Sequence, residues 1–101
     1  MNVNIQESDG KLVATLAGEM DTAAAAAAEK VLSTLYESDG KDVVIDCTDL
    51  LYIASSGLRI LLAILKASKA AGATVTLRHV NHDIMNVLEL TGFISVFEFD
   101  N

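Results

Sequence analysis

One stretch near the middle of the chain constrains the fold more than any other feature. The apolar run Val43–Ile45 is unbroken, which favours a strand that is buried on both faces of a sheet. A polar loop through residue 54 follows and ends at Ser55 and Ser56, and residues 58–71 then have the apolar spacing of a helix. Either serine can cap that helix, where a negative group would also lie at the positive end of the helix dipole. The stretch therefore predicts a strand, a loop and a helix, with a serine hydroxyl at the junction.

The residues before this stretch have the pattern of a hairpin followed by a helix. Residues 3–8 and 11–17 alternate apolar and polar side chains, and Asp9-Gly10 between them favours a tight turn. We expect residues 18–22 to break the second strand, with Asp21 or Thr22 as the N-cap of the next helix.

That helix begins with six alanines, residues 23–28, and is expected to run to Tyr36. Alanine is the best helix former, so the run needs no functional explanation. A stripe at helical spacing is expected to face the core, formed by Ala28, Val31, Leu32 and Leu35.

The helix after the serines has a wide apolar arc. Its polar side carries Arg59 and Lys66, and its main core stripe is formed by Leu58, Leu61, Leu62 and Leu65. Deep burial is the preferred interpretation of the arc, and a partly exposed docking face beside Ser56 is the alternative.

The remaining chain continues the alternation of strands and helices. We expect a strand over residues 74–80, a short helix capped by Asn81 and stopped by Gly92, and a final strand over residues 93–99. The sequence therefore predicts one α/β domain over residues 1–101, with a mixed central sheet in which an N-terminal antiparallel hairpin is followed by alternating βαβαβαβ order.

This order also predicts where a functional site lies. Parallel strands joined by right-handed crossovers bring their carboxyl ends to one edge of the sheet, where open α/β sheets place their ligands. That edge should hold Asp21, the loop over residues 46–56 and residues 79–83. Position in the fold thus selects Ser56.

Three segments of the sequence resemble one family. Asp49-Leu50 followed by Ser55-Ser56-Gly57-Leu58 resembles the core motif of STAS domains, and more narrowly that of the small bacterial anti-sigma-factor antagonists. Residues 18–21 (Gly-Glu-Met-Asp) and 90–93 (Leu-Thr-Gly-Phe) extend the resemblance over nearly the whole chain. The chain departs from the pattern at Ala54, where the family often has Asp.

The resemblance implies a binding switch rather than an enzyme. In that family the serine directly before the glycine, here Ser56, is phosphorylated by a partner kinase that is also the anti-sigma factor. The unphosphorylated domain binds this kinase and frees the sigma factor, and a phosphatase reverses the modification. Asp21, Ser55, Ser56, Gly57 and Arg59 are the expected partner-binding residues. The alternative within the family is a subunit of a stress-signalling assembly or of a membrane-transporter complex.

Arg59 has two possible roles beside Ser56. It lies three residues later on the predicted helix, so it could reach a phosphate on that serine or meet an acidic group on the partner. The formal net charge of −7 favours docking slightly, because an exposed cation stands out on an acidic domain.

Composition argues against several kinds of partner, site and targeting segment. The net charge of −7 disfavours nucleic acid and anionic membranes as partners. Cys47 is the single cysteine and cannot form an internal disulfide or a zinc site alone, so we expect a small buried hydrophobe. The first residues have no basic and apolar regions of a signal peptide, and no apolar run approaches the ~20 residues of a membrane span. We expect a cytoplasmic domain without cofactor.

Two enzyme-like alternatives and a metal site fit less well. A serine hydrolase would need a Gly-x-Ser-x-Gly turn and a placed histidine, whereas His79 and His82 are expected to be surface or capping residues. A phosphoaspartate receiver would need an acidic pair and a late lysine that the chain lacks. Asp46 and Asp49 alone are weak evidence for a cation site, and no metal is expected.

Overall fold

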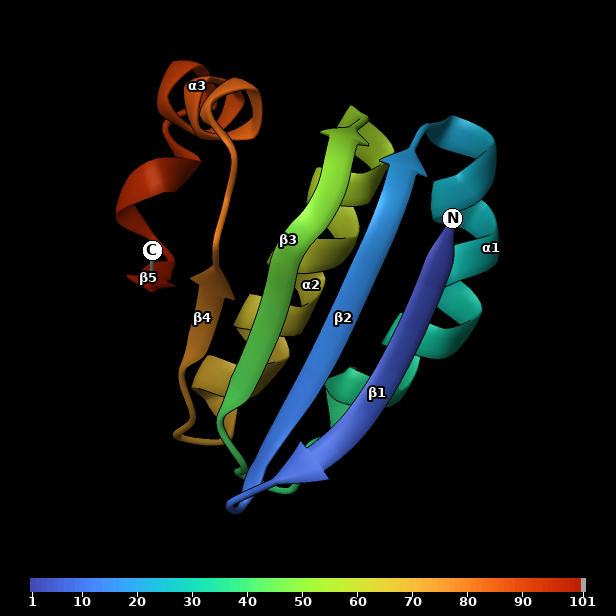
Figure 1. Cartoon of the computed structure of the whole chain (residues 1–101). Helices are drawn as coiled ribbons and strands as arrows, with labels where there is room; N and C mark the ends of the chain where they lie inside the picture. Colours follow the sequence, from blue (N-terminus) through green and yellow to red (C-terminus); the bar gives the residue numbers. More distant parts are fainter. Residues whose placement is uncertain (101) are drawn as a thin grey trace.

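The computed structural model describes residues 1–100 as five strands, three α-helices and two short 3-10 helices. The strands lie in the order β1-β2-β3-β4-β5 in one sheet, and Figure 1 shows α1 and α2 side by side against one face of it. In chain order the elements are β1 (Asn2–Ser8), β2 (Lys11–Met20), α1 (Thr22–Leu32), η1 (Ser33–Glu37), β3 (Val43–Ile53), α2 (Ser55–Ala70), β4 (Val75–Arg78), α3 (His82–Thr91), η2 (Phe93–Ser95) and β5 (Glu98–Asp100).

The strand pairing confirms the predicted mixed sheet. β1 and β2 are antiparallel across a two-residue turn in which Asp9 and Gly10 have φ angles of 53° and 78°, as a type I′ hairpin requires. β2, β3, β4 and β5 are mutually parallel neighbours. The carboxyl ends of these four strands consequently point to one edge of the sheet.

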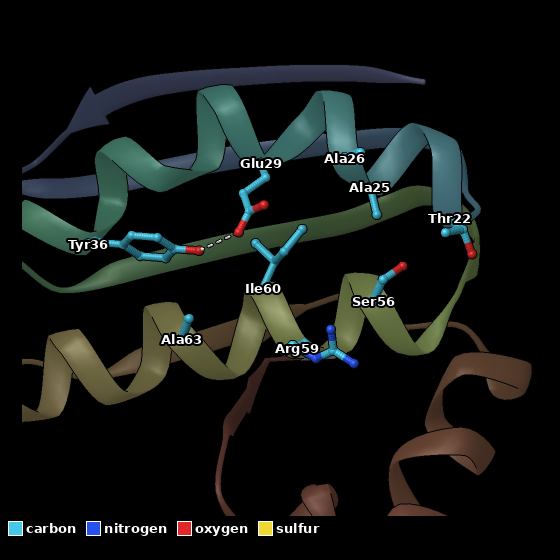
Figure 2. A pocket seen from close by; sticks show the side chains of 9 residues that line it. All are labelled: Thr22, Ala25, Ala26, Glu29, Tyr36, Ser56, Arg59, Ile60 and Ala63. Carbon is cyan, nitrogen blue, oxygen red and sulfur yellow. Dashed lines mark hydrogen bonds between the residues drawn. The ribbon is translucent and has the colours of Figure 1, made fainter.

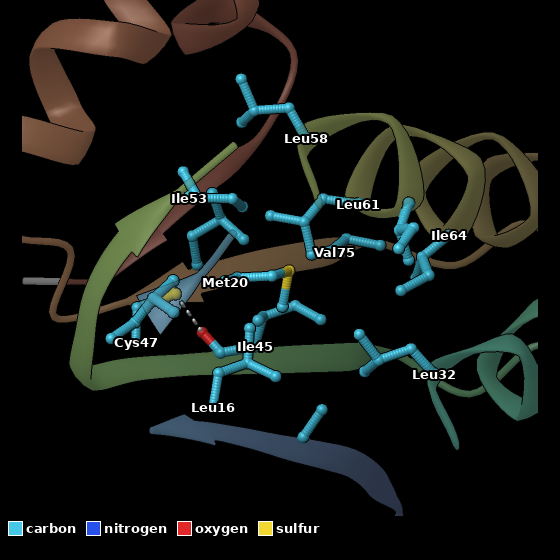
Figure 3. Close-up of a cluster of buried hydrophobic side chains, with 14 of the residues drawn as sticks. Leu16, Met20, Leu32, Ile45, Cys47, Ile53, Leu58, Leu61, Ile64 and Val75 are labelled. Atoms are coloured by element: carbon cyan, nitrogen blue, oxygen red, sulfur yellow. Dashed lines mark hydrogen bonds between the residues drawn. The ribbon is translucent and has the colours of Figure 1, made fainter. Parts of the chain in front are cut away.

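The hydrophobic core lies between the sheet and the pair formed by α1 and α2. Figure 3 shows Leu16 and Ile45 of the strands and Leu32 and Ile64 of the helices directed into a common interior, where all four are fully buried. Val43, Val44 and Ile45 are also buried, which confirms the prediction of a central strand. Most of the apolar arc of α2 is covered, so deep burial is the correct interpretation. No helix within residues 1–100 is both long and apolar enough to cross a membrane.

Two segments that the sequence predicted as loops are strands. β2 continues through Gly18 to Met20 and β3 continues through Asp49 to Ile53, because the two extensions pair with each other. The register between them shifts twice, and Gly18 has a φ of 106°, which a side chain rarely tolerates. These irregularities remove the alternation of apolar and polar residues by which a strand is recognised.

One burial and two element boundaries also differ from the predictions. Val31 is 41% exposed, because it faces the side of α1 toward β1 and not the core. Residues 93–99 do not form one strand, since a 3-10 turn follows the left-handed Gly92 and only Glu98–Asp100 joins the sheet. β4 ends at Arg78 because His79 has a φ of 55°.

Candidate functional site

The carboxyl edge of the sheet is held together by hydrogen bonds between the ends of its strands. The backbone N–H of Ala54 donates to the Met20 carbonyl at 2.8 Å, which joins the ends of β2 and β3. The Asn81 amide donates to the Leu50 carbonyl at 3.0 Å, which joins the start of α3 to β3. The residues expected at this edge therefore do gather there.

Two helices begin at this edge with side-chain caps. Asp21 is the N-cap of α1 and accepts a hydrogen bond from the Ala24 N–H at 2.8 Å. Asn81 is the N-cap of α3 and accepts from the Ile84 N–H at 2.9 Å. Both predictions are confirmed, with Thr22 lying one position inside α1. The Asp21 carboxylate is exposed and so remains accessible to a partner.

Neither serine caps α2, which corrects the prediction. The N-cap residue is Ala54, in extended conformation and without a side-chain hydrogen bond to the helix. Ser55 and Ser56 are the first and second helical residues, because β3 runs as far as Ile53 and leaves only one residue between strand and helix. The first N–H groups of α2 therefore have no side-chain acceptor from the cap residue.

Gly57 allows α2 to begin close to the sheet. A Cβ atom at this buried position would lie 2.7 Å from Cγ1 of Ile53 and 2.7 Å from the sulfur of Met20. Such contacts are far shorter than van der Waals distances, so a larger residue would push α2 away. Gly57 thus fixes the position of Ser56 through packing.

Ser56 borders a groove between α1 and α2. The groove has a volume of about 330 Å³, with Thr22 and Ser56 at one end, Ile60 in the middle, and Tyr36 and Ala63 at the other end (Figure 2). The hydroxyl oxygen of Ser56 is buried and, among the described residues, has no hydrogen-bond partner; Ser68 shares this property. Ser55 is exposed outside the groove. The Ser56 side chain would therefore have to rotate before an enzyme could reach its hydroxyl oxygen.

Arg59 lies beside Ser56 on the same wall of the groove. Figure 2 shows its guanidinium extending toward the turn of α2 that carries the serine. The residue is exposed, and within residues 1–100 it forms neither an ion pair nor a side-chain hydrogen bond. At the far end of the groove the Tyr36 hydroxyl donates to the Glu29 carboxylate at 3.4 Å, and burial followed by the Glu29 charge raises the pKa of Tyr36.

A second polar group lies on β3, away from the serines. Asp46 accepts hydrogen bonds from the Thr48 N–H at 3.0 Å and the Thr48 hydroxyl at 2.6 Å. Because that hydroxyl donates to Asp46, Nδ1 of His79, 2.9 Å away, donates to the Thr48 oxygen. Burial raises the pKa of Asp46, but the Thr48 bonds and the nearby Arg78 and His79 outweigh it and lower the pKa.

This geometry gives little support to the enzyme and metal alternatives. Within residues 1–100, no hydrogen bond joins either histidine to Ser55 or Ser56, and no cluster of three or more His, Cys, Asp or Glu side chains could hold a metal. Cys47 is buried, as predicted, and burial followed by the Asp46 charge raises the pKa of its thiol to about 12. A thiol with this pKa remains protonated near neutral pH and is a poor nucleophile.

Two exposed apolar residues at this edge were missed in the sequence. Leu51 is 64% and Tyr52 is 51% exposed at the end of β3, directly before the start of α2. The run of four apolar residues over 50–53 was the available signal, because successive side chains of a strand point to opposite faces, so such a run is buried only where both faces are covered. Together with Asp21, they border the edge on which Ser55 is exposed.

The chain is similar to proteins of one kind over its whole length. A family model described as the STAS domain matches residues 2–101. BtrV of Bordetella bronchiseptica, assigned as an anti-sigma factor antagonist, is 31% identical over 101 residues, which cover 100% of this chain and 87% of that protein.

Solved structures agree with the fold. An anti-sigma factor antagonist from Mycobacterium paratuberculosis has a TM-score of 0.81 and 26% identity, with 98% of this chain and 84% of that chain covered. SpoIIAA of Bacillus, solved in its phosphorylated form, has a TM-score of 0.75 at 17% identity, with 99% and 92% covered, and shares the fold.

Proposed function

The chain belongs to the STAS domain family, and we propose that it is an anti-sigma factor antagonist whose binding is switched by phosphorylation of Ser56. The observation that carries the proposal is the position of Ser56 at the uncapped start of α2, directly before the buried Gly57. The similarity to BtrV of Bordetella bronchiseptica, which is assigned as an anti-sigma factor antagonist and is 31% identical over the full chain, supports the same function.

In the unphosphorylated state, the domain would bind an anti-sigma factor through the carboxyl edge of the sheet. The exposed groups there are Asp21, Ser55 and Arg59, and Leu51 and Tyr52 supply apolar area beside them. Gly57 would act through packing, because it is buried and sets where Ser56 lies. Once the domain is bound to the anti-sigma factor, the sigma factor would be released. With such a partner, the protein would act in the cytoplasm.

Phosphorylation would end this interaction by adding charge at the contact surface. The γ-phosphoryl group of ATP is transferred to the Ser56 oxygen, so that a new P–O bond forms, the bond to the β-phosphate bridge breaks, ADP leaves and the hydroxyl proton passes to a base of the kinase. The phosphate carries about −1.5 to −2 charges at pH 7. The start of α2 tolerates that charge in the free domain, whereas an interface buried against acidic or apolar groups does not.

The proposal is tested by capture followed by phosphorylation. Wild type, Ser56→Ala and Ser56→Asp are immobilised in parallel, and proteins captured from a lysate of the source cell are identified by mass spectrometry. We expect wild type and Ser56→Ala to capture an anti-sigma factor that Ser56→Asp loses. Incubation of that partner with the domain and ATP should then place one phosphate on Ser56.

Three kinds of result would overturn the proposal. Phosphate found only on Ser55, or still present on Ser56→Ala, would refute the assignment of the acceptor. Capture of a membrane transporter or of a large stress-signalling assembly, with no anti-sigma factor, would favour the other roles that STAS domains have. A domain that processes a small substrate without any partner would contradict a pure binding function.

A further inference from the structure

We propose that the groove between α1 and α2 receives the phosphoryl group of phosphorylated Ser56 and that Arg59 is its counter-ion. This inference rests on the proposed phosphorylation of Ser56. It specifies where the phosphate lies and which residue neutralises its negative charge. It makes Arg59 a two-state residue, exposed to a partner before phosphorylation and paired within the chain afterwards.

The groove offers the space that such a group requires. Its volume of about 330 Å³ is several times that of the four heavy atoms of a phosphoryl group, and Ser56 is one of its lining residues. Next to the serine, the wall formed by α1 is made of Ala25 and Ala26 beside Thr22, so no long side chain of α1 crosses the opening there (Figure 2). The alanine run of α1 thus leaves room on the side of Ser56.

The polar groups at this end of the groove favour an anion. Arg59 follows Ser56 by three residues on α2, a spacing at which side chains are neighbours on a helix surface. Its guanidinium is not engaged by any carboxylate within the described part of the chain. Within residues 1–100, α2 lacks the side-chain cap that α1 and α3 have, and the Ser56 oxygen is buried without a hydrogen-bond partner. A charge-assisted hydrogen bond from Arg59 to the phosphate would pair the cation with the anion at this end of the groove.

The acidic group of the groove is directed elsewhere. Glu29 accepts a hydrogen bond from Tyr36 toward the opposite end, so Arg59 is the charged side chain drawn nearest to Ser56 in Figure 2. Phosphorylation would then have two consequences for binding. It adds negative charge at the edge, and it engages the guanidinium of Arg59 that would otherwise be available to an acidic partner group.

The test uses the full chain with phosphoserine encoded at position 56, so that no kinase is needed. The second ionisation of a serine phosphate, with a pKa of about 6, is followed by ³¹P NMR titration. A guanidinium in contact lowers this pKa, and we expect Arg59→Ala to raise it by about half a unit or more. Lys66→Ala, which removes another exposed cation of α2 two turns further on, is the matched control and should leave the titration unchanged.

A second pair of variants tests the groove itself. Ala26→Leu fills the groove beside Ser56, whereas Ala27→Leu makes the same change on the side of α1 that faces β1. We expect Ala26→Leu to remove most of the Arg59-dependent shift and Ala27→Leu to keep it. Equal titrations of the phosphorylated protein with and without Arg59 would refute the counter-ion, and equal effects of the two leucines would refute the groove.

These outcomes are separable from those of the proposed function. If the encoded phosphate titrates independently of Arg59 while the captured kinase still modifies Ser56, the switch stands and this inference fails. If the Arg59-dependent shift is found but no kinase modifies Ser56, the pairing is real and the proposed function fails.

Discussion

Among the residues described, the starts of α1 and α3 differ from the start of α2, although all three lie at the carboxyl edge of the sheet. α1 and α3 are closed by the side chains of Asp21 and Asn81, each of which accepts a hydrogen bond from the first turn. α2 begins at Ala54, which offers no side-chain acceptor, and carries a buried hydroxyl without a partner. Side chains of the domain thus cap two of these helix starts, and the third has no such cap.

The difference is instructive because a cap and a phosphate satisfy the same groups. A carboxylate or amide oxygen at an N-cap occupies the N–H donors and the positive end of the dipole that an added anion would otherwise use. A capped helix start is therefore a poor place for a phosphorylation switch. The start of α2 is held instead by close packing through Gly57, which stabilises the helix without occupying those donors.

The largest effect is expected from breaking this packing. Gly57→Val places side-chain atoms where a Cβ alone would be 2.7 Å from Ile53 and Met20, so the end of β3 and the start of α2 must separate. We expect a loss of about 1–3 kcal/mol in the free energy of unfolding, measured by urea denaturation. Ala63→Val, a half-buried change further along α2, should cost far less; equal losses would show that the contact at Gly57 is not special.

Removing a cap should have the next largest effect. Asn81→Ala deletes the acceptor for the Ile84 N–H and the donor to the Leu50 carbonyl, so both α3 and its attachment to β3 are weakened. We expect a loss of about 1–2 kcal/mol in thermal or chemical unfolding. Asp21→Ala removes a single cap bond on an exposed residue and should cost about 1 kcal/mol. An Asn81→Ala protein as stable as wild type would contradict the assigned caps.

The start of α3 has a further support that can be tested by pH. Hydrogen bonds from Thr48 lower the pKa of Asp46, and the same hydroxyl accepts from His79, two residues before the cap. A carboxyl whose pKa is lowered on folding stabilises the protein above its unfolded pKa of about 3.9, and this stabilisation is lost as the pH falls through the lower folded pKa.

We therefore expect Thr48→Val to cost a few tenths of a kcal/mol near pH 6 and to converge with wild type as the pH falls through the lowered pKa of Asp46. Unfolding followed at several pH values between about 2 and 6 measures the difference. A gap between the two proteins that persists or widens in acid would mean that the Thr48 bonds do not act through the Asp46 carboxylate.

Much of this architecture could be predicted from the sequence, and the failures share a cause. Three kinds of feature depend on the conformational preferences of a few neighbouring residues. They are the hairpin turn at Asp9-Gly10, the caps Asp21 and Asn81, and the buried strand at Val43–Ile45. The extensions of β2 and β3 depend on each other, because irregular pairing between distant segments is not visible as alternation in either.

The same cause explains the error at the serines. With β3 expected to end at Ile45, a loop of several residues left Ser55 or Ser56 free to cap α2. The extension of β3 to Ile53 moves both serines one or two positions into the helix and makes Ala54 the cap. The groove depends on how α1 and α2 pack against each other, which no single segment encodes.

The smallest expected effect is the most direct test of the comparison between capped and uncapped helix starts. Ser55→Ala and Ser56→Ala remove hydroxyls that make no cap bond, and alanine is the better helix former. Removal of the buried, unpartnered Ser56 hydroxyl should leave the free energy of unfolding within about 0.5 kcal/mol of wild type or raise it slightly. Ser68→Ala, which deletes the other such hydroxyl of α2 outside the groove, is the control for stability. A loss above about 1 kcal/mol for Ser56→Ala alone would mean that the serine does cap α2 in solution, and the contrast with Asp21 and Asn81 would disappear.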